Sequence, residues 1–307
     1  MTPLEDSPAT PTPLGVNLSF AVKRWPEPEV WAAFVRRELG VELVQFSFDL
    51  LDPWWPEALS RPLARRVRDA AAAEGLELHS AFSGLAAYSY NGLLHPESEG
   101  RRAAYGWFER AADLAAEMGA AAVGGPVGGL SVQEAAQPAR VKERYDELVT
   151  ALGTLSEYVG RAGLAEVLLE PTPLVREIPS TVAEAEQFLE DLREVSAVPV
   201  RYALDLGHAL YRPLYGAEAS LEPWLALGGA VALVHLQQTD AQSDSHWGFS
   251  QAGVVDVAAV AAQLSRAGVH VPLILEVFYP FERDDDAVRR EIVSSVRHCR
   301  TALEQNV

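Results

Sequence analysis

Val167-Leu168-Leu169-Glu170 is an apolar run, too short for a helix, that ends in one carboxylate just before Pro171-Thr172-Pro173. The same pattern, a short apolar run closed by a residue type that binds divalent metals, recurs three times downstream. The closing residues lie 35, 30 and 41 positions apart, and each interval is about the length of one strand–helix unit. The three later runs are 202–205 (YALD), 231–235 (VALVH) and 273–276 (LILE).

Strand-like and helix-like segments alternate along the rest of the chain. With the four runs above they make eight strand–helix units without a break in composition. Strict alternation predicts a parallel sheet, and eight repeats predict one closed (β/α)₈ TIM barrel of the α/β class rather than an open Rossmann sheet. The glycines between 124 and 129 lack the G-x-G-x-x-G spacing of a dinucleotide site. We expect further strands at 15–20, 41–48, 76–82 and 120–123, and helices at 29–39, 62–74, 101–118, 137–162, 181–192, 215–227, 255–267 and 285–304.

Length and composition limit the class of protein. The 307 residues fit a single barrel, so we expect one catalytic domain at 14–307. Residues 1–13 hold four prolines and little apolar surface, which predicts a disordered tail. No signal peptide or membrane-spanning run is present, and the single Cys299 cannot form an internal disulfide. A cytoplasmic protein without a membrane partner is the expectation.

Charge narrows the range of partners. The net charge of −18 and the pI near 4.8 disfavour binding to a phosphate backbone, so nucleic acid is not expected as a partner. A small anionic substrate is compatible with this net charge, because cationic groups inside one pocket can dominate the local electrostatic field. The pair Trp54-Trp55 would suit either a pocket wall or the contact face of a homo-oligomer.

The four closing residues predict a metal site. They end strands five to eight, and in a barrel the carboxyl ends of the strands meet at one mouth. Two Glu, one Asp and one His form a hard, oxygen-rich set that suits one divalent cation, Mn²⁺ first, with Mg²⁺, Co²⁺ or Zn²⁺ as alternatives. Three carboxylates at one mouth would repel one another strongly without a cation. The expected ligands are Glu170, Asp205, His235 and Glu276.

Several other polar or aromatic residues follow the predicted strands and are candidates for substrate binding. His208 could point at a substrate oxygen or serve in helix capping and packing. Arg176 and Glu177, after strand five, could cover the mouth or form a surface ion pair. His246, after strand seven, could belong to a lid or to an exposed charged loop, and Trp25, after strand one, could bind substrate or pack.

Four motifs carry a resemblance to a known group of proteins. They are 169–172 (LEPT), 205–208 (DLGH), 234–240 (VHLQQTD) and 275–277 (LEV). With them the chain resembles the xylose isomerase-like sugar (phosphate) isomerase/epimerase superfamily over about residues 15–303, and within it the ketose 3-epimerases. The resemblance implies that Glu170, Asp205, His235 and Glu276 bind the metal and that the two glutamates also move protons. It further implies that His208 contacts a substrate oxygen and that Glu177 binds the reacting end of the sugar.

The loops indicate a branch of that superfamily. Ketose epimerases carry an arginine about six residues after the metal histidine, where this chain has Ala241. The loops 237–240 (QQTD) and 176–181 (REIPST) are more similar to those of the tetrulose-phosphate epimerases. Arg176, Lys23 or Ser131 could then hold a phosphate.

The resemblance implies an isomerase: a metal-dependent epimerase that acts next to a ketose carbonyl through an enediolate, on a small sugar or sugar phosphate. An aldose–ketose isomerase and an inosose dehydratase of the same superfamily remain alternatives, and so does a non-catalytic sugar-binding barrel. Apurinic endonucleases share the barrel, but their three-zinc cluster and basic groove conflict with seven histidines and a net charge of −18.

Overall fold

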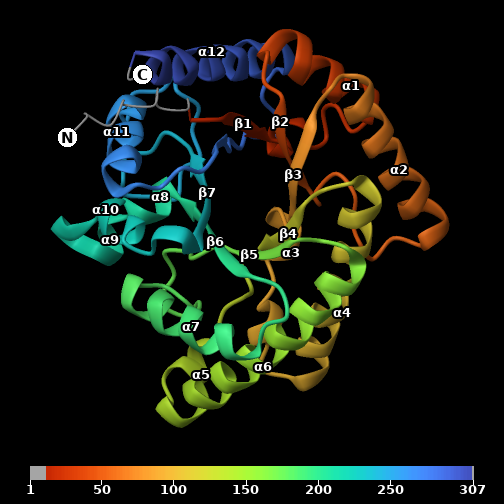
Figure 1. Ribbon diagram of the computed structural model, residues 1–307. Coiled ribbons are helices and arrows are strands. Elements are labelled where there is room, and N and C mark those ends of the chain that lie inside the picture. Colours follow the sequence, from red (N-terminus) through yellow and green to blue (C-terminus); the bar gives the residue numbers. More distant parts are fainter. Residues whose placement is uncertain (1–11, 306–307) are drawn as a thin grey trace, which may run out of the picture.

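A closed barrel of parallel strands forms the centre of the protein in a computed structural model, which describes residues 12–305 (Figure 1). The strands follow one another around the barrel in sequence order, and the first pairs with the last, Val16 opposite Leu275. The predicted (β/α)₈ fold is confirmed. The strands are β1 (Leu14–Asn17), β2 (Leu43–Ser47), β3 (Glu77–Phe82), β4 (Ala122–Gly125), β5 (Glu166–Leu169), β6 (Val200–Asp205), β7 (Val231–Leu236) and β8 (Leu273–Leu275).

Long helices surround the sheet, as Figure 1 shows. Each packs its apolar stripe on the outer face of the strands, so the strands are buried on both faces and read as continuous apolar runs. These helices are α1 (Pro28–Phe34), α2 (Glu57–Ala73), α4 (Ser98–Met118), α6 (Pro138–Ala162), α7 (Val182–Val195), α11 (Val257–Ala267) and α12 (Asp285–Glu304). No helix of residues 12–305 is long and apolar enough to cross a membrane.

Small and branched side chains fill the barrel interior below the mouth. Gly124 of β4 is part of this close packing, because a Cβ built there would lie 1.9 Å from the carbonyl oxygen of Leu168 on β5. Only glycine therefore lets these two strands approach as they do. The interior cluster consists of Phe82, Ala122, Leu168, Ala203, Ala232, Leu233 and Ile274.

Some predicted boundaries were wrong. The first strand ends at Asn17, and Leu18–Ala21 is a 3-10 turn in which the Asn17 side chain accepts a hydrogen bond from the backbone N–H of Ser19. Helix α2 begins at Glu57 and contains Pro62, which we expected to start it. Within residues 12–305 the predicted 1–13 tail is represented only by 12 and 13, so that prediction lies almost wholly outside the described residues.

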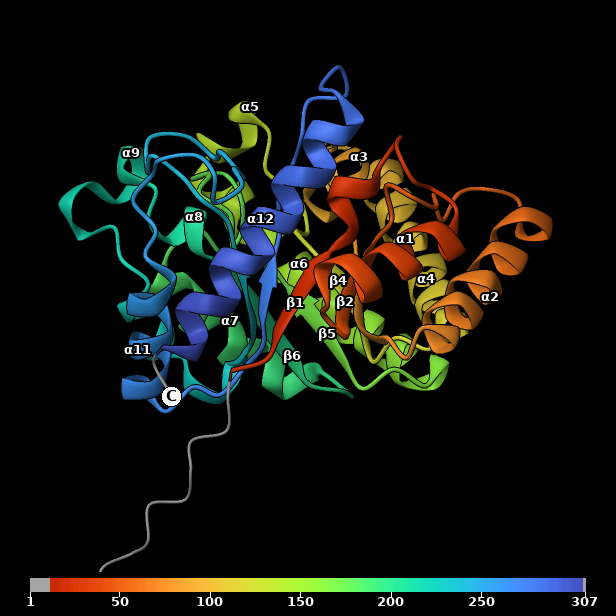
Figure 2. The same cartoon turned by 90° about the horizontal axis from the view of Figure 1, so that it is seen from above.

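The sixth unit has no long helix. Prolines at 213 and 223 and a glycine at 216 interrupt the expected segment, because proline lacks the N–H that a continuing helix needs. The short helices α8, α9 and α10 take its place between β6 and β7. Other short helices follow β3 and β4, and Figure 2 shows α3, α5 and α9 at the same end of the barrel. The short helices are α3 (Leu85–Tyr88), α5 (Val132–Ala135), α8 (Leu206–Ala209), α9 (Arg212–Tyr215) and α10 (Glu222–Leu225).

Candidate active site

The four strand-end residues predicted to bind a metal meet at the mouth of the barrel. Asp205 is the last residue of β6 and His235 lies near the end of β7, while Glu170 and Glu276 follow β5 and β8 directly. One ligand atom from each lies within 4.8 Å of the others. The geometry follows from the topology, since neighbouring parallel strands point their last residues into one ring.

A chain of hydrogen bonds fixes the ring of His235. The backbone N–H of Ser19 donates to Asn17 Oδ1, so Asn17 Nδ2 must face and donate to Gln45 Oε1, 2.6 Å away. Gln45 Nε2 in turn donates to Ser80 Oγ. Because Gln45 Oε1 only accepts, the contact of 2.8 Å from His235 Nε2 places the ring proton on Nε2.

His235 Nδ1 then faces two carboxylates. It lies 3.1 Å from Glu170 Oε1 and 3.1 Å from Glu276 Oε2. A lone pair opposed by two anionic oxygens is unfavourable unless a positive charge, a second ring proton or a metal cation, lies among them. The arrangement therefore fits a cation.

Asp205 has one bonded and one unbonded carboxylate oxygen. Oδ1 accepts from the backbone N–H of His208 at 2.9 Å and from Gln237 Nε2 at 2.7 Å. Oδ2 is buried and has no hydrogen-bond partner among the described residues. Buried polar atoms are almost always satisfied, so an unpaired carboxylate oxygen beside this histidine matches the donor set of a divalent cation.

Burial and neighbouring charge shift the pKa values at the centre. Burial raises the pKa of Glu276 to about 7; His235 opposes that shift and the carboxylate of Glu170 adds to it. Burial lowers the pKa of His235, but the carboxylates of Glu276 and Glu170 have the larger effect, so the pKa is raised overall. A carboxyl group with a pKa near neutrality suits proton transfer.

Three residues of this centre were missed in the sequence: Asn17, Gln45 and Gln237. Asn17 Nδ2 also donates to Glu276 Oε1 at 2.9 Å, so Asn17 and Gln45 together orient Glu276 and His235. Gln45 interrupts the apolar side chains of Leu43, Val44 and Phe46, and Gln237 follows His235 by two residues, the period of one strand face. Neither pattern shows what these side chains contact.

Two histidines and one aspartate form a second group beside the first. Asp244 Oδ1 lies 3.4 Å from His208 Nε2 and 3.0 Å from His246 Nε2, and His208 Nδ1 donates to the carbonyl of Pro171. Burial lowers the pKa of His246, but Asp244 outweighs it and raises it to about 9; the pair of histidines holds the pKa of Asp244 far below its usual range. Oxygen and nitrogen atoms of Asp205, His208 and His246 also lie within 4.8 Å of one another, which makes them a rival ligand set.

The remaining sequence candidates occupy different places. Glu177 is buried beside the site, where burial raises its pKa and a hydrogen bond from Thr172 opposes the shift. Arg176 donates to the backbone carbonyl of Leu130, and Trp25 packs its ring 5.5 Å from that of Phe34. A substrate-binding role for these three residues stays a prediction.

A cavity of about 250 Å³, the reaction cavity, opens onto the centre. Its size is close to the lower end of small-molecule sites, roughly 300–1,000 Å³. Among the described residues that line it there is no lysine or arginine, so histidines are its cationic groups. The polar lining residues are Ser83, Tyr88, Glu170, Thr172, His208, Asp244, Ser245, His246 and Glu276.

Known proteins share this sequence and this architecture. A D-erythrulose 1-phosphate 3-epimerase of Brucella abortus (strain 2308) is 25% identical over 242 residues, which cover 78% of this chain and 77% of that protein. A crystal structure from Rhodospirillum rubrum, provisionally assigned as a xylose isomerase, is 39% identical with a TM-score of 0.92, over 94% of this chain and 99% of the other. The D-psicose 3-epimerase of Clostridium cellulolyticum H10 shares the fold at 14% identity and a TM-score of 0.71, over 95% and 99% of the two chains.

A family of known proteins also matches the chain. Residues 35–298 match the family described as xylose isomerase-like TIM barrels, which is most of the chain. This confirms the resemblance drawn from the four strand-end motifs. The protein belongs to the xylose isomerase-like TIM barrel family.

Proposed function

We propose that the protein is an isomerase-class enzyme that epimerises a ketose at the carbon next to its carbonyl, with one divalent cation held by Glu170, Asp205, His235 and Glu276. The observation that carries the proposal is the lone pair of His235 Nδ1 facing two glutamate oxygens at 3.1 Å. The unpaired, buried Oδ2 of Asp205 supports it. The oxygen-rich set suits Mn²⁺ first.

The chemistry begins with a C–H bond that is a weak acid. When bound, a divalent cation would polarise the ketose carbonyl and so raise the acidity of the neighbouring carbon. Glu276 is the base we assign to that proton, because it follows β8 directly and lines the reaction cavity beside the proposed cation site. Asn17, which donates to Glu276 Oε1, holds this carboxylate in position.

Inversion requires a second acid on the other side of the carbon. Glu170 comes from β5 and Glu276 from β8, and both line the reaction cavity. If Glu276 removes the proton and Glu170 returns one to the opposite face, the configuration inverts. His208 and His246 also line the cavity as N–H donors that would hold substrate oxygens.

The substrate that the relatives suggest is a four-carbon ketose phosphate. The Brucella abortus relative is a D-erythrulose 1-phosphate 3-epimerase. Lys23 and Arg283 line a cavity of about 920 Å³ that shares Leu85, Ser245 and Phe278 with the reaction cavity, and there they could receive a phosphate. Of the other two residues considered for a phosphate, Arg176 donates to a backbone carbonyl and Ser131 caps α5.

An aldose–ketose isomerase is the second candidate. It is favoured by the relative of 39% identity that is provisionally assigned as a xylose isomerase. The same two glutamates would serve, but the proton would return to the neighbouring carbon. The two reactions therefore differ in their products.

Product analysis tests the proposal. The Mn²⁺-loaded protein is incubated with D-erythrulose 1-phosphate in D₂O, and the products are separated and examined by NMR. We expect the C3 epimer with deuterium at C3. An aldose phosphate would show the isomerase instead, and unchanged ketose across a panel of phosphorylated and free ketoses would contradict the proposal.

A further inference from the structure

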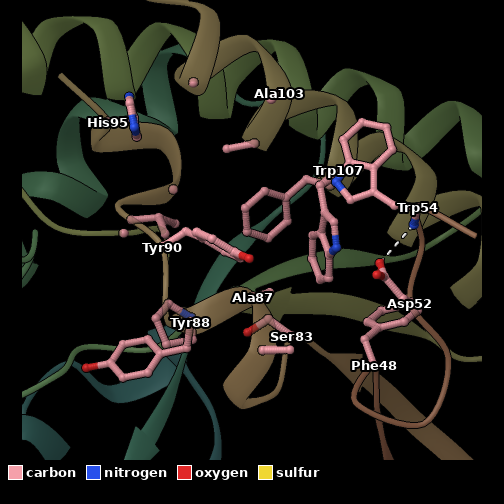
Figure 3. A pocket seen from close by; sticks show the side chains of 18 of the residues that line it. Phe48, Asp52, Trp54, Ser83, Ala87, Tyr88, Tyr90, His95, Ala103 and Trp107 are labelled. Carbon is pink, nitrogen blue, oxygen red and sulfur yellow. Dashed lines mark hydrogen bonds between the residues drawn. The ribbon is translucent and has the colours of Figure 1, made fainter. Parts of the chain in front are cut away.

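A second cavity beside the reaction cavity has no role in the chemistry above. We call it the aromatic cavity; its volume is about 490 Å³, and its rings include those of Phe48, Trp54, Tyr88, Tyr90, Trp107 and Phe108. Figure 3 shows Phe48, Trp54 and Trp107 on one side and Tyr90 and His95 on the other, with Ser83 and Ala87 between them. Its volume lies well within the range of small-molecule sites, roughly 300–1,000 Å³.

The aromatic cavity and the reaction cavity are neighbours. Ser83, Tyr88 and Pro126 line both, so the two cavities meet at these residues. Glu170 and Glu276 line the reaction cavity. A molecule whose reacting carbons lie beside these glutamates would therefore extend into the aromatic cavity if it were longer than a four-carbon sugar.

Ser83 supplies a polar group at this boundary without a partner in the protein. Its side chain is 2% exposed, and Oγ has no hydrogen-bond partner among the described residues. Gly125 makes room for it, since a Cβ at that position would lie 2.1 Å from Ser83 Oγ. A buried hydroxyl left unpaired is unfavourable, so a ligand hydroxyl at this point would be stabilising.

The aromatic walls are held in place before any ligand arrives. Phe48 and Trp107 pack edge to face with ring centroids 5.5 Å apart, and both are nearly fully buried. Trp54 is 48% exposed but lies under the guanidinium of Arg110 at 5.0 Å. The Trp54 backbone N–H also donates to Asp52 Oδ1. Fixed aromatic faces bind a flat, weakly polar ring face at little cost in entropy.

The chemistry of the lining selects one kind of ring. The aromatic faces suit the C–H face of a pyranose, while Ser83 Oγ, the Asp52 carboxylate and the His95 imidazole lie among them to receive hydroxyls. A phosphate is disfavoured, because Asp49 and Asp52 are in the lining and no lysine or arginine is, among the described residues. A purely apolar ring would leave the Ser83 hydroxyl unpaired.

We infer that the site also takes ketoses that carry a glycosyl ring at the end remote from the carbonyl, and that the aromatic cavity binds this ring. The inference rests on the proposed function, because it takes the ketose end to lie in the reaction cavity. It adds a substrate class and assigns specificity to residues of α4 and of the loops after β2, β3 and β4.

Binding, measured apart from turnover, tests the inference. The probes are isomaltulose, a fructose with a glucosyl ring on its last carbon, and D-fructose, both titrated by ligand-observed NMR into the Mg²⁺-loaded protein. We expect isomaltulose to bind about tenfold more tightly than fructose, or about 1.4 kcal/mol. Equal affinities would overturn the inference.

Variants that fill the cavity make the test specific. Ala103 lies at the cavity on the exposed surface of a helix, and Ala103→Trp should remove the advantage of isomaltulose over fructose. If that variant does not fold, Ala87→Leu on α3 provides the same test and should have the same effect. Ala72→Trp, an exposed site on α2 outside the cavity, is the matched control and should keep the advantage. An advantage that survives both filling variants would also overturn the inference.

Deuterium exchange, measured with isomaltulose, D-fructose and D-erythrulose 1-phosphate, separates the epimerase proposal from the ring-site inference. If no ketose exchanges but isomaltulose still binds more tightly and Ala103→Trp removes this preference, the epimerase proposal fails and the ring site stands. If erythrulose phosphate exchanges and isomaltulose shows no binding advantage, the epimerase stands and the ring site fails.

Discussion

The carboxylate of Glu276 is contacted by three side chains at the mouth of the barrel. Asn17 donates to Oε1, while His235 Nδ1 and His246 Nδ1 lie 3.1 and 3.8 Å from Oε2. Burial raises its pKa to about 7. These contacts place a proton-accepting oxygen in the cavity and keep it there without substrate.

Glu276→Gln should therefore lower the rate of exchange of the substrate α-proton with D₂O by about 10²–10⁴-fold, the usual contribution of a positioned base. The amide keeps the shape and one oxygen, so the fold should be retained. Glu186→Gln, on the exposed face of α7, is the control and should exchange at the wild-type rate. Exchange by Glu276→Gln at the wild-type rate would show that another group is the base.

Asp244 contacts both His208 and His246, and its contribution to the stability of the fold depends on pH. The folded-state pKa of His246 is raised from 6.5 to about 9, so the pair stabilises the fold fully below pH 6.5 and loses this contribution as pH rises through about 9. Asp244→Asn should lower the stability by about 1–2 kcal/mol below pH 6.5, a figure reduced for solvent screening because the Asp244 side chain is 39% exposed.

The measurement is urea unfolding of the metal-free protein across pH, together with the NMR titration of His246. Asp240→Asn is the control, since Asp240 is exposed on the same loop and asparagine keeps its acceptor oxygen. A stability difference for Asp244→Asn that grew with pH, or an unchanged titration of His246, would contradict this account.

At the scale of the elements, Gly124 on β4 determines how closely β4 and β5 approach. A Cβ there would meet backbone, the carbonyl of Leu168 at 1.9 Å, which cannot move without disturbing the ladder. Gly124→Ala should lower the free energy of unfolding by about 1–3 kcal/mol or more, as overpacking does. Glu170 follows β5, so metal affinity should fall with it.

Gly229→Ala is the matched control for this strand. A Cβ at Gly229 has no atom within 4 Å among the described residues, and no positive φ is required there, so the change in stability should stay within about 0.5 kcal/mol. Urea unfolding monitored by circular dichroism measures both variants. Equal stabilities for the two variants would show that the sheet adjusts at Gly124 without cost.

The elements also show why some of the fold was predictable from sequence. Buried parallel strands are short apolar runs, and the runs before Glu170, Asp205 and Glu276 have that form with no competing helical period. The short turns of the sixth unit were not predictable, because its prolines and Gly216 interrupt the segment where a helix was expected. An interrupted segment shows no hydrophobic period that would distinguish a loop from four short helical turns.

For the whole molecule, barrel closure turns distant positions into one site. Four residues spread over positions 170 to 276 were predictable as a group, because each ends a strand. Asn17 and Gln45 were not, since their roles appear only when β1 and β2 close the ring against β7 and β8. The aromatic cavity has the same origin. Its residues lie on the loops after β2, β3 and β4 and on α4, and no sequence spacing links Phe48 to Trp107.

The proposed chemistry depends on a single divalent ion held by Glu170, Asp205, His235 and Glu276. The most direct test is calorimetric titration of Mn²⁺ into metal-free protein, its His235→Gln variant and its His208→Gln and His246→Gln variants. The wild type should bind one ion per chain, His235→Gln should weaken binding by more than about 100-fold, and the other two by less than about tenfold. Wild type without a site, or a site lost in His208→Gln and His246→Gln but retained in His235→Gln, would contradict the claim.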